Sequence, residues 1–384
     1  MAVADDQRPT DDQRPAGVQR PAGVLPLTYD ECRARFRRVA AISGATLSSH
    51  PLDATGPEGQ RLTIDAARLG AERPDRALVV LSGVHGVEGF IGSALQCDLL
   101  TRVDPGTLPA DAAILAIHAV NPWGMAWWRR QNESNVDPNR NWARDRIDPP
   151  DNPGYAELHE LLCPVEGPPS GESFLGPIAR YVQDHGLDWV RRAVSAGQYS
   201  HPDGLYFGGD RLEASTRIVG AIVAEALAGT GVGVCVDLHT GHGAHGEPTI
   251  LSDHRPGSPA DEWLRRHFDP TIIETTVDNP DATSATKVGQ ISHGLADVVP
   301  GADWHSFTLE IGTRHETRML IAEREEHWVH RHGDRSRPEH AEIVWNHRVC
   351  STPDDPVWVA SAMGHGRRVL DSALTAVVDA PSPR

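Results

Sequence analysis

Short apolar runs alternate along the chain with longer segments in which apolar residues recur at helical spacing. The runs 77–84 and 232–239 are almost continuously apolar, as expected of strands that are buried on both faces of a sheet. The segments 89–100 and 214–228 are longer, and Gly229 ends the second of them. This alternation favours an α/β fold over an all-α or an all-β fold.

The pattern predicts seven strands and seven helices. The strands are expected over 60–66, 77–84, 112–120, 232–239, 249–252, 271–276 and 306–311. The helices are expected over 28–42, 89–100, 174–184, 214–228, 260–267, 317–332 and 359–378. Elements in this order fit a mixed sheet of the eight-stranded type with helices on both faces.

Three stretches lack this pattern. Residues 1–24 repeat DDQRP and QRPAGV without aromatic residues, which predicts a disordered N-terminal tail, and 379–384 are expected to form a C-terminal tail. The stretch 145–209 is rich in proline and glycine and predicts an insertion. No long linker divides the remainder, so we expect a single catalytic domain over 25–378.

Composition and charge exclude some classes of partner. Among 384 residues, 53 are acidic and 36 are basic, so the net charge of −17 opposes binding to nucleic acid or to an anionic membrane. No apolar run reaches the roughly 18 residues that a membrane-spanning helix needs. The acidic N-terminus does not resemble a secretory signal, and the five dispersed cysteines suit a reducing compartment. We therefore expect a soluble cytoplasmic protein.

Polar residues follow several predicted strands, where ligands bind in open α/β sheets. After the strand 77–84, His85 and Glu88 are three residues apart, and His239 ends the strand 232–239. Two imidazoles and one carboxylate form a ligand set of catalytic zinc sites, with one position left for water. His242 and His245, in the next loop, remain alternative ligands.

Two further groups of residues are candidates for catalysis and substrate binding. Glu310 ends an apolar strand, a position that suits a catalytic carboxylate. A loop rich in glycine, proline and asparagine after the strand 112–120 carries Arg129, Arg130, Asn139 and Arg140. Guanidinium groups in such a loop suggest recognition of a carboxylate.

These segments resemble the zinc carboxypeptidase family. HGVE (85–88), NPWG (121–124), WRR (128–130), VDPNRNW (136–142), DLH (237–239) and FTLE (307–310) occur in the order of the family's motifs. The phrases SGVHGVEGFIGSALQ (82–96) and GQYSHPDGLYFGG (197–209) are more similar to a bacterial carboxypeptidase-like group carried as a domain of unknown function. The resemblance spans residues 25–378 and implies the mixed-sheet fold of the carboxypeptidases, a phosphorylase/hydrolase-like fold.

The resemblance implies a role for each matching residue. His85, Glu88 and His239 would be ligands of Zn²⁺, and Glu310 would be the general base that acts on zinc-bound water. Such a carboxylate takes a proton from the water and later passes it to the leaving amine.

The same resemblance assigns the residues of the loop. Arg129 would stabilise the oxyanion, with Arg130 as the alternative one position away. Asn139 and Arg140 would bind a substrate carboxylate. The family's mobile tyrosine is missing, because the corresponding position holds Val288. We expect the insertion to rim the pocket.

The predicted function is a zinc-dependent hydrolase that cleaves an amide bond adjacent to a free carboxylate. Its substrate would be a small peptide or an acylated amino acid. The first alternative is an N-acyl amino acid deacylase of the aspartoacylase and succinylglutamate desuccinylase type, since those proteins share HxxE, DLH and a strand-end glutamate. The second alternative is a non-catalytic binding protein with the same fold.

Overall fold

The computed structural model describes residues 25–142, 150–279 and 284–381; the predicted tail 1–24 and residues 382–384 lie outside this part of the chain. Within it, eight strands form one sheet in the order β1-β2-β4-β3-β5-β8-β6-β7. They are β1 (Thr46–Thr55), β2 (Arg61–Gly70), β3 (Arg76–Ser82), β4 (Ala112–His118), β5 (Val232–Gly241), β6 (Pro248–Ser252), β7 (Ile273–Thr275) and β8 (Asp303–Gly312).

The sheet is mixed. Its central strands β4, β3, β5 and β8 are parallel. β1 and β2 join one side in antiparallel pairings, and β6 joins the other side antiparallel to β8. This arrangement confirms the predicted mixed α/β sheet. The carboxyl ends of the central strands meet at one edge, where the predicted ligands lie.

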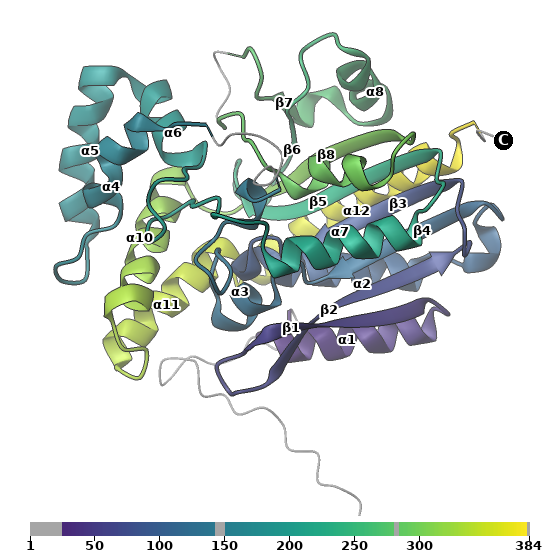
Figure 1. The fold of residues 1–384 in the computed structure, drawn as a ribbon, viewed down its shortest axis with the longest axis horizontal. Helices are drawn as coiled ribbons and strands as arrows, with labels where there is room; N and C mark the ends of the chain where they lie inside the picture. The colour runs from purple at the N-terminus through teal and green to yellow at the C-terminus, as the bar shows by residue number, and fades with distance from the viewer. Residues whose placement is uncertain (1–24, 143–149, 280–283, 382–384) are drawn as a thin grey trace, which may run out of the picture.

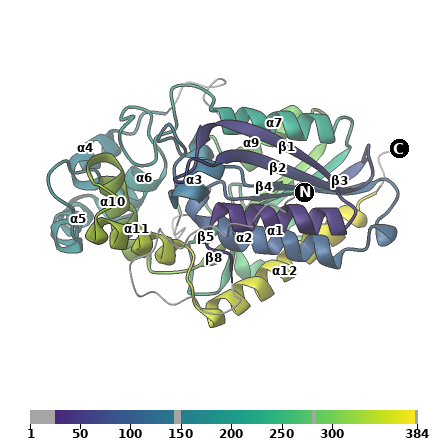
Figure 2. The ribbon, with the colours of Figure 1, turned by 90° about the horizontal axis from the view of Figure 1, so that it is seen from below.

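Helices cover both faces of the sheet, as Figure 2 shows: α1 (Tyr29–Ile42), α2 (Gly89–Arg102) and α12 (Pro356–Val378) lie on one face, and α7 (Ala214–Ala226) lies on the other. The other α-helices are α3 (Pro122–Trp127), α4 (Pro153–Leu162), α5 (Gly171–His185), α6 (Leu187–Ser195), α8 (Pro259–His267), α9 (Ile291–Gly294), α10 (Glu316–His332) and α11 (Pro338–Ser351). The 3-10 turns are η1 (Gly86–Glu88), η2 (Pro105–Thr107), η3 (Pro138–Arg140), η4 (Pro270–Ile272) and η5 (Leu295–Val298).

The two-sided cover explains why the central strands are apolar at nearly every position. Successive side chains of a strand point to opposite faces. In β3, Leu78 and Val80 pack in the core beneath α2 and α12, whereas Val79 and Leu81 pack in the core beneath α7. Both faces of β3 are therefore buried.

A smaller helical body lies beyond one end of the sheet. α4, α5 and α6 fall within the predicted insertion, and Figure 1 shows them beside α10 at one end of the molecule. They have a hydrophobic cluster of their own, which includes Tyr155, Phe174, Val190 and, from α10, Ile321. The pattern predicted one or two helices in this stretch, and the structure has three; α4 and α6 are short helices whose buried residues lie on one side.

The short helices α3 and α9 were not predicted, and neither were two longer elements, β1 and α11. β1 is an edge strand that contains Pro51 and is largely exposed, so it shows little apolar alternation. α11 buries His340, His347 and Arg348 where a helix usually buries aliphatic side chains. Both segments differ from the patterns on which the prediction depends.

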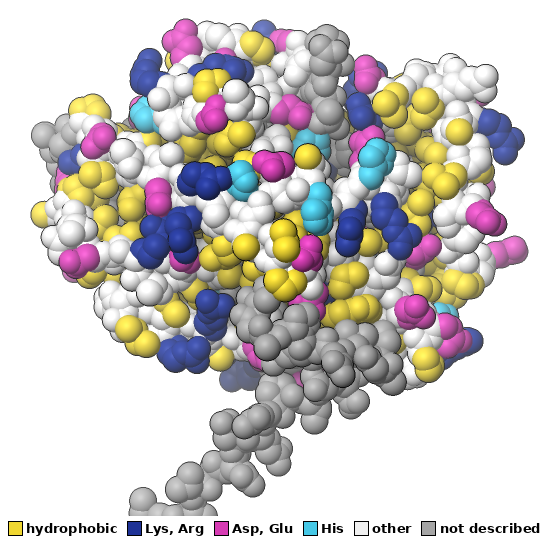
Figure 3. Space-filling view, turned by 180° about the vertical axis from the view of Figure 1, so that it is seen from behind, with side chains coloured by type: hydrophobic (Ala, Val, Ile, Leu, Met, Phe, Trp, Pro, Cys, Tyr) yellow, Lys and Arg dark blue, Asp and Glu magenta, His cyan; other side chains and the backbone are white. Residues whose placement is uncertain are grey.

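The surface mixes both signs of charge on the face seen in Figure 3, where basic and acidic side chains are interspersed with apolar ones. In the part of the chain that the structure describes, no helix has the length and apolar character needed to cross a membrane.

Candidate metal centre

The turn after β3 carries two of the predicted metal ligands. Gly83 has φ +65, which favours glycine as the chain leaves the strand. Gly86 packs so closely on α3 that an added Cβ would lie 2.0 Å from a backbone atom of Gly124. These glycines let η1 fold against α3, so that Nδ1 of His85 lies 3.0 Å from Oε1 of Glu88.

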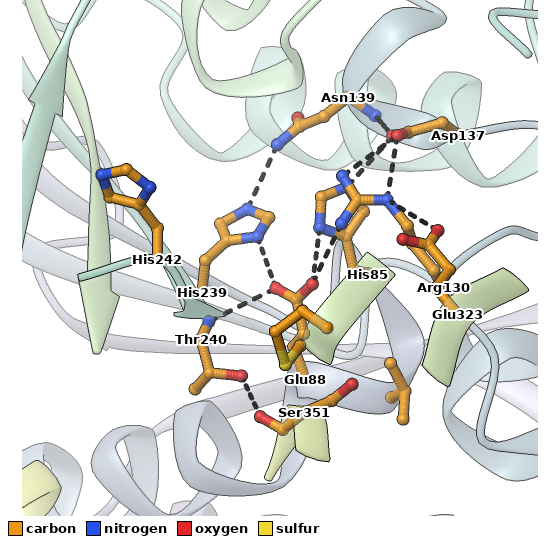
Figure 4. A network of polar contacts seen from close by, with 12 residues as sticks. His85, Glu88, Arg130, Asp137, Asn139, His239, Thr240, His242, Glu323 and Ser351 are labelled. Atoms are coloured by element: carbon orange, nitrogen blue, oxygen red, sulfur yellow. Dashed lines mark hydrogen bonds and ion pairs between the residues drawn. The ribbon is translucent and has the colours of Figure 1, made fainter. Parts of the chain in front are cut away.

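The third predicted ligand comes from the neighbouring strand. β3 and β5 are parallel, with Leu81 paired to Asp237, so both chains leave the sheet at the same edge. Nδ1 of His239 lies 2.8 Å from Oε2 of Glu88. Figure 4 shows the two imidazoles on either side of that carboxylate. The ligand atoms of His85, Glu88 and His239 lie within 4.8 Å of one another, and no other such cluster occurs among the described residues.

Each histidine has a second carboxylate at its far nitrogen. Nε2 of His85 lies 3.0 Å from Oδ1 of Asp137, and Nε2 of His239 lies 2.8 Å from Oδ2 of Asp237. Histidines that bind a metal characteristically hold the other ring nitrogen against a carboxylate or carbonyl, which orients the ring and fixes its tautomer. Two imidazoles and a carboxylate supported in this way fit a divalent metal such as Zn²⁺.

The electrostatics of the cluster also suit a cation. Burial opposes the ionisation of Glu88, but His85 and His239 hold its pKa below the ordinary value. Burial would lower the pKa of His239, yet Asp237 and Glu88 raise it well above the usual range. With neutral imidazoles the cluster contains three carboxylates, including Asp137, so a divalent cation would offset a surplus of negative charge.

Arg130 lies against this cluster. Its Nη1 donates to Oε1 of Glu88 at 3.3 Å, and its Nη2 donates to Oδ2 of Asp137 at 3.2 Å. The guanidinium also stands over the ring of Tyr206, 5.3 Å from the centroid. Burial would lower the pKa of Arg130, but Asp137 and Glu323 raise it, so the group stays a cation.

Arg129 does not reach the cluster. Its side chain is fully buried, and its Nε donates to Oε2 of Glu326 at 3.1 Å. α3 ends at Trp128, whose left-handed φ of 54 redirects the chain just before the two arginines. Of the two arginines predicted for this role, Arg130, named as the alternative, therefore lies at the cluster, and Arg129 does not.

Glu310 lies across from the histidines. It is paired with His239 in the register of β5 and β8, and it lines a cavity of about 310 Å³ beside the cluster. The ring of His242 lies 3.3 Å from Glu274, and Nδ1 of His245 contacts the carbonyl of Thr313. Neither alternative histidine joins the three ligand residues.

Asn139 and Arg140 follow in η3. The Asn139 amide donates to Oδ2 of Asp237 at 3.1 Å and also faces Nε2 of His239, so it supports the metal centre from behind. Arg140 lines the cavity, and its Nη2 donates to the carbonyl of Ser195 at 2.6 Å. Its buried Nε has no hydrogen-bond partner among the described residues.

Three residues at the site were not predicted. Asp137 is the one carboxylate of VDPNRNW, and its position beside Asn139 and Arg140 was the signal that could have identified it. Tyr206 comes from the predicted insertion and lines the cavity. Lys287 also lines the cavity, and it is the only lysine in the sequence.

Comparison with known proteins assigns a family. Residues 26–364 match the family described as Protein of unknown function (DUF2817), so the chain belongs to that family. The predicted similarity to a group carried as a domain of unknown function is thereby confirmed. No curated protein matches the chain in sequence.

Solved structures resemble the chain at low identity. Carboxypeptidase A from Helicoverpa armigera is 14% identical with a TM-score of 0.45, over 91% of this chain and 74% of that one. Bovine thrombin-activatable fibrinolysis inhibitor is 12% identical with a TM-score of 0.43, over 89% and 97%. Succinylglutamate desuccinylase from Chromobacterium violaceum is 17% identical with a TM-score of 0.35, over 83% and 74%. At these TM-scores we base no functional conclusion on the similarity.

Proposed function

We propose that this protein is a zinc-dependent hydrolase that cleaves an amide bond adjacent to a free carboxylate. The observation that carries the proposal is the cluster of His85, Glu88 and His239, in which a carboxylate lies at the far nitrogen of each histidine. The cluster opens on a cavity that Glu310 and Arg140 also line. A metal-binding group, a carboxylate and a cation thus face one space.

His85, Glu88 and His239 would hold the metal. When bound, Zn²⁺ acidifies water and polarises a carbonyl. Glu310 is the carboxylate that would accept a proton from the attacking water and return it to the leaving nitrogen. Its position opposite His239 in the sheet register keeps it close to the ligands without making it one of them.

The two arginines would act on different parts of the substrate. Arg130 can donate to the oxygen of the scissile carbonyl as charge develops on it, and Glu88 and Asp137 hold the guanidinium in place. Arg140, which lines the cavity, would bind the free carboxylate. Asn139, which the resemblance assigned to the substrate, would instead hold Asp237, the carboxylate at Nε2 of His239.

The experiment is a hydrolysis panel of dipeptides and N-acyl amino acids, each tested as the free acid and as its C-terminal amide, with and without a chelator. We expect cleavage of the free acids that chelation abolishes and zinc restores. Equal cleavage of acids and amides would contradict the carboxylate requirement. Cleavage that persists without metal would contradict the zinc chemistry.

The second candidate is an N-acyl amino acid deacylase. It is favoured by the apolar wall of the cavity, which could accept an acyl chain. The same panel separates the candidates, because a deacylase would prefer N-acyl amino acids over dipeptides of similar size. The five cysteines are all unpaired, which supports placing the enzyme in a reducing compartment under either candidate.

A further inference from the structure

One wall of the cavity is built by helices of the predicted insertion. α5 contributes Phe174, Ile178 and Val182, and α6 contributes Leu187, Val190 and Val194. The spacing within each set, three or four residues, places its members on one face of their helix. Two helices therefore present apolar faces to the same space as Glu310 and Arg130.

Packing within the protein does not fully bury this wall. Ile178 and Val182 are half-buried, and Leu187 is 45% exposed. Apolar surface that remains in contact with water does not contribute the favourable free energy of burial. An apolar group of a substrate that entered the cavity would bury this surface and so gain that free energy.

The wall is held in place relative to the metal centre. At the end of α6, the carbonyl of Ser195 accepts a hydrogen bond from Arg140. One turn earlier, Arg191 pairs with Glu316 of α10 at 3.0 Å. A substrate whose carboxylate binds Arg140 would therefore have the wall within reach.

We propose that the α5–α6 wall binds an extended apolar group of the substrate, so that the enzyme acts on amphiphilic amides that carry one carboxylate and one apolar chain. The chain could be the acyl group or the side chain of the amino acid. This inference rests on the proposed function for the position of the carboxylate.

The test uses two series of substrates. One lengthens the acyl chain of an N-acylglycine from acetyl to hexanoyl to decanoyl, and the other changes the amino acid of an N-acetyl derivative from glycine to leucine to phenylalanine. We expect kcat/KM to rise in one series, by up to about fourfold per buried methylene until the cavity is filled. The series that responds identifies the source of the apolar group. No rise in either series overturns the proposal.

A pair of leucines provides matched variants. Leu187 lines the cavity and is 45% exposed, whereas Leu175 is 47% exposed and lies outside the lining. We expect Leu187→Ser combined with Ile178→Ser to lower kcat/KM for the longest substrates about three- to tenfold and to spare the acetyl compound. Leu175→Ser should change neither value. Equal effects of the wall variant and the control overturn the proposal.

Binding without turnover separates this inference from the proposed function. Calorimetry with acetate, hexanoate and decanoate should show affinity that increases with chain length in the wild type and increases less in the wall variant. If affinity increases in this way but no amide is hydrolysed, the result would support binding of apolar chains at the wall and contradict the proposed hydrolase activity. If amides are hydrolysed at rates that do not depend on the acyl chain or the side chain, the result would support the hydrolase and contradict the role of the wall.

A different observation concerns Lys287. It is the only lysine of the sequence, and it lines the cavity with Arg140. Its Nζ donates to Oγ of Ser284 and to the carbonyl of Ala285, both neutral acceptors. We infer that Lys287 binds the substrate carboxylate together with Arg140, which makes it a specificity-determining residue for the proposed reaction.

Chemical modification can test this role directly, because only Lys287 and the N-terminal amine can react with amine-selective reagents. We expect hexanoate to protect Lys287 from acetylation, measured by mass spectrometry of its peptide, and hexanol not to protect it. Lys287→Gln should raise KM for free-acid substrates about tenfold, with little change for their amides, and Lys287→Arg should restore much of the affinity. Equal acetylation with both compounds and an unchanged KM in Lys287→Gln overturn the inference.

Discussion

The metal centre and the α5–α6 wall lie on the same cavity but are built in opposite ways. At the metal centre, His85 and His239 each contact carboxylates through both ring nitrogens. The two histidines are buried and lie at the ends of adjacent parallel strands. The wall consists of apolar side chains on two helices outside the sheet, some buried and others half-buried, and Leu187 remains exposed to solvent.

In the proposed function, the metal centre carries out the reaction and the wall selects the substrate. The central strands are buried on both faces, so their ends can move little and hold polar groups in fixed geometry. The helical body has its own small hydrophobic cluster and can vary in its lining without disturbing the sheet. We expect changes at the metal centre to have large effects on every substrate, and changes at the wall to have small effects that depend on the substrate.

The largest effect is expected from removing a metal ligand. His85→Ala should abolish bound zinc and reduce hydrolysis to background, because only two of three protein ligands remain. Elemental analysis of the purified protein measures the metal. His245→Ala is the control and should keep the metal, since that ring contacts the Thr313 carbonyl. Unchanged zinc content in His85→Ala would rule out the assigned site.

The next largest effect concerns the general base. Glu310→Gln should lower kcat by roughly 10²- to 10⁴-fold while zinc content and unfolding midpoint stay close to wild type. Glu316→Gln, which also alters a carboxylate of the cavity lining, should have a much smaller effect because it lies at the Arg191 pair. Similar rates in both variants would assign the proton transfer to another group.

The adjacent arginines allow a residue at the site, Arg130, to be compared with a residue that has a structural role, Arg129. Arg130→Met should lower kcat by about 10²- to 10³-fold, as expected when a donor to the developing oxyanion is lost. Arg129→Met should leave kcat of the folded protein nearly unchanged but destabilise it by about 3 kcal/mol, because Glu326 loses one of its buried partners. Steady-state kinetics and urea unfolding measure the two effects. The reverse result would return the oxyanion role to Arg129.

A smaller effect is expected from the carboxylate behind His239. Asp237→Asn should weaken zinc affinity by about 10- to 100-fold, measured by competition with a chelator, because the imidazole loses the partner that orients it. Asp303→Asn is a control, since Asp303 also pairs with a histidine, His305, at 3.3 Å, but is exposed and lies outside the cluster. Equal losses in both variants would show that Asp237 has no special role.

The smallest effect concerns pH. Burial lowers the pKa of Lys287 to about 8, and Arg140 and Arg130 add to this shift, while Asp253 and Glu310 oppose it. Above that pH the ammonium loses its charge, so KM for a free-acid substrate should rise a few-fold between pH 7 and pH 9. Lys287→Arg should remove this rise, because a guanidinium stays protonated. A rise that persists in Lys287→Arg must come from another group.

The sequence could predict the sheet and the clustering of the three proposed ligands because both depend on local patterns. A strand buried on both faces is apolar along its whole length, as in β3 and β5. The spacing of His85 and Glu88 needs only one tight turn, and the ends of parallel strands share one edge. The edge strand β1 and the polar helix α11 were not predicted because neither shows such a pattern.

The sequence by itself therefore predicted the order of the main strands and helices and the three residues that cluster at the strand ends. Tertiary structure alone decided that Arg130 rather than Arg129 faces the site, because that depends on the backbone angle at Trp128 and on Glu326, nearly two hundred positions away. It also brought Asp137 to His85 and Lys287 to the cavity. Those contacts join segments far apart in the chain, and only the packing of the folded protein brings them together.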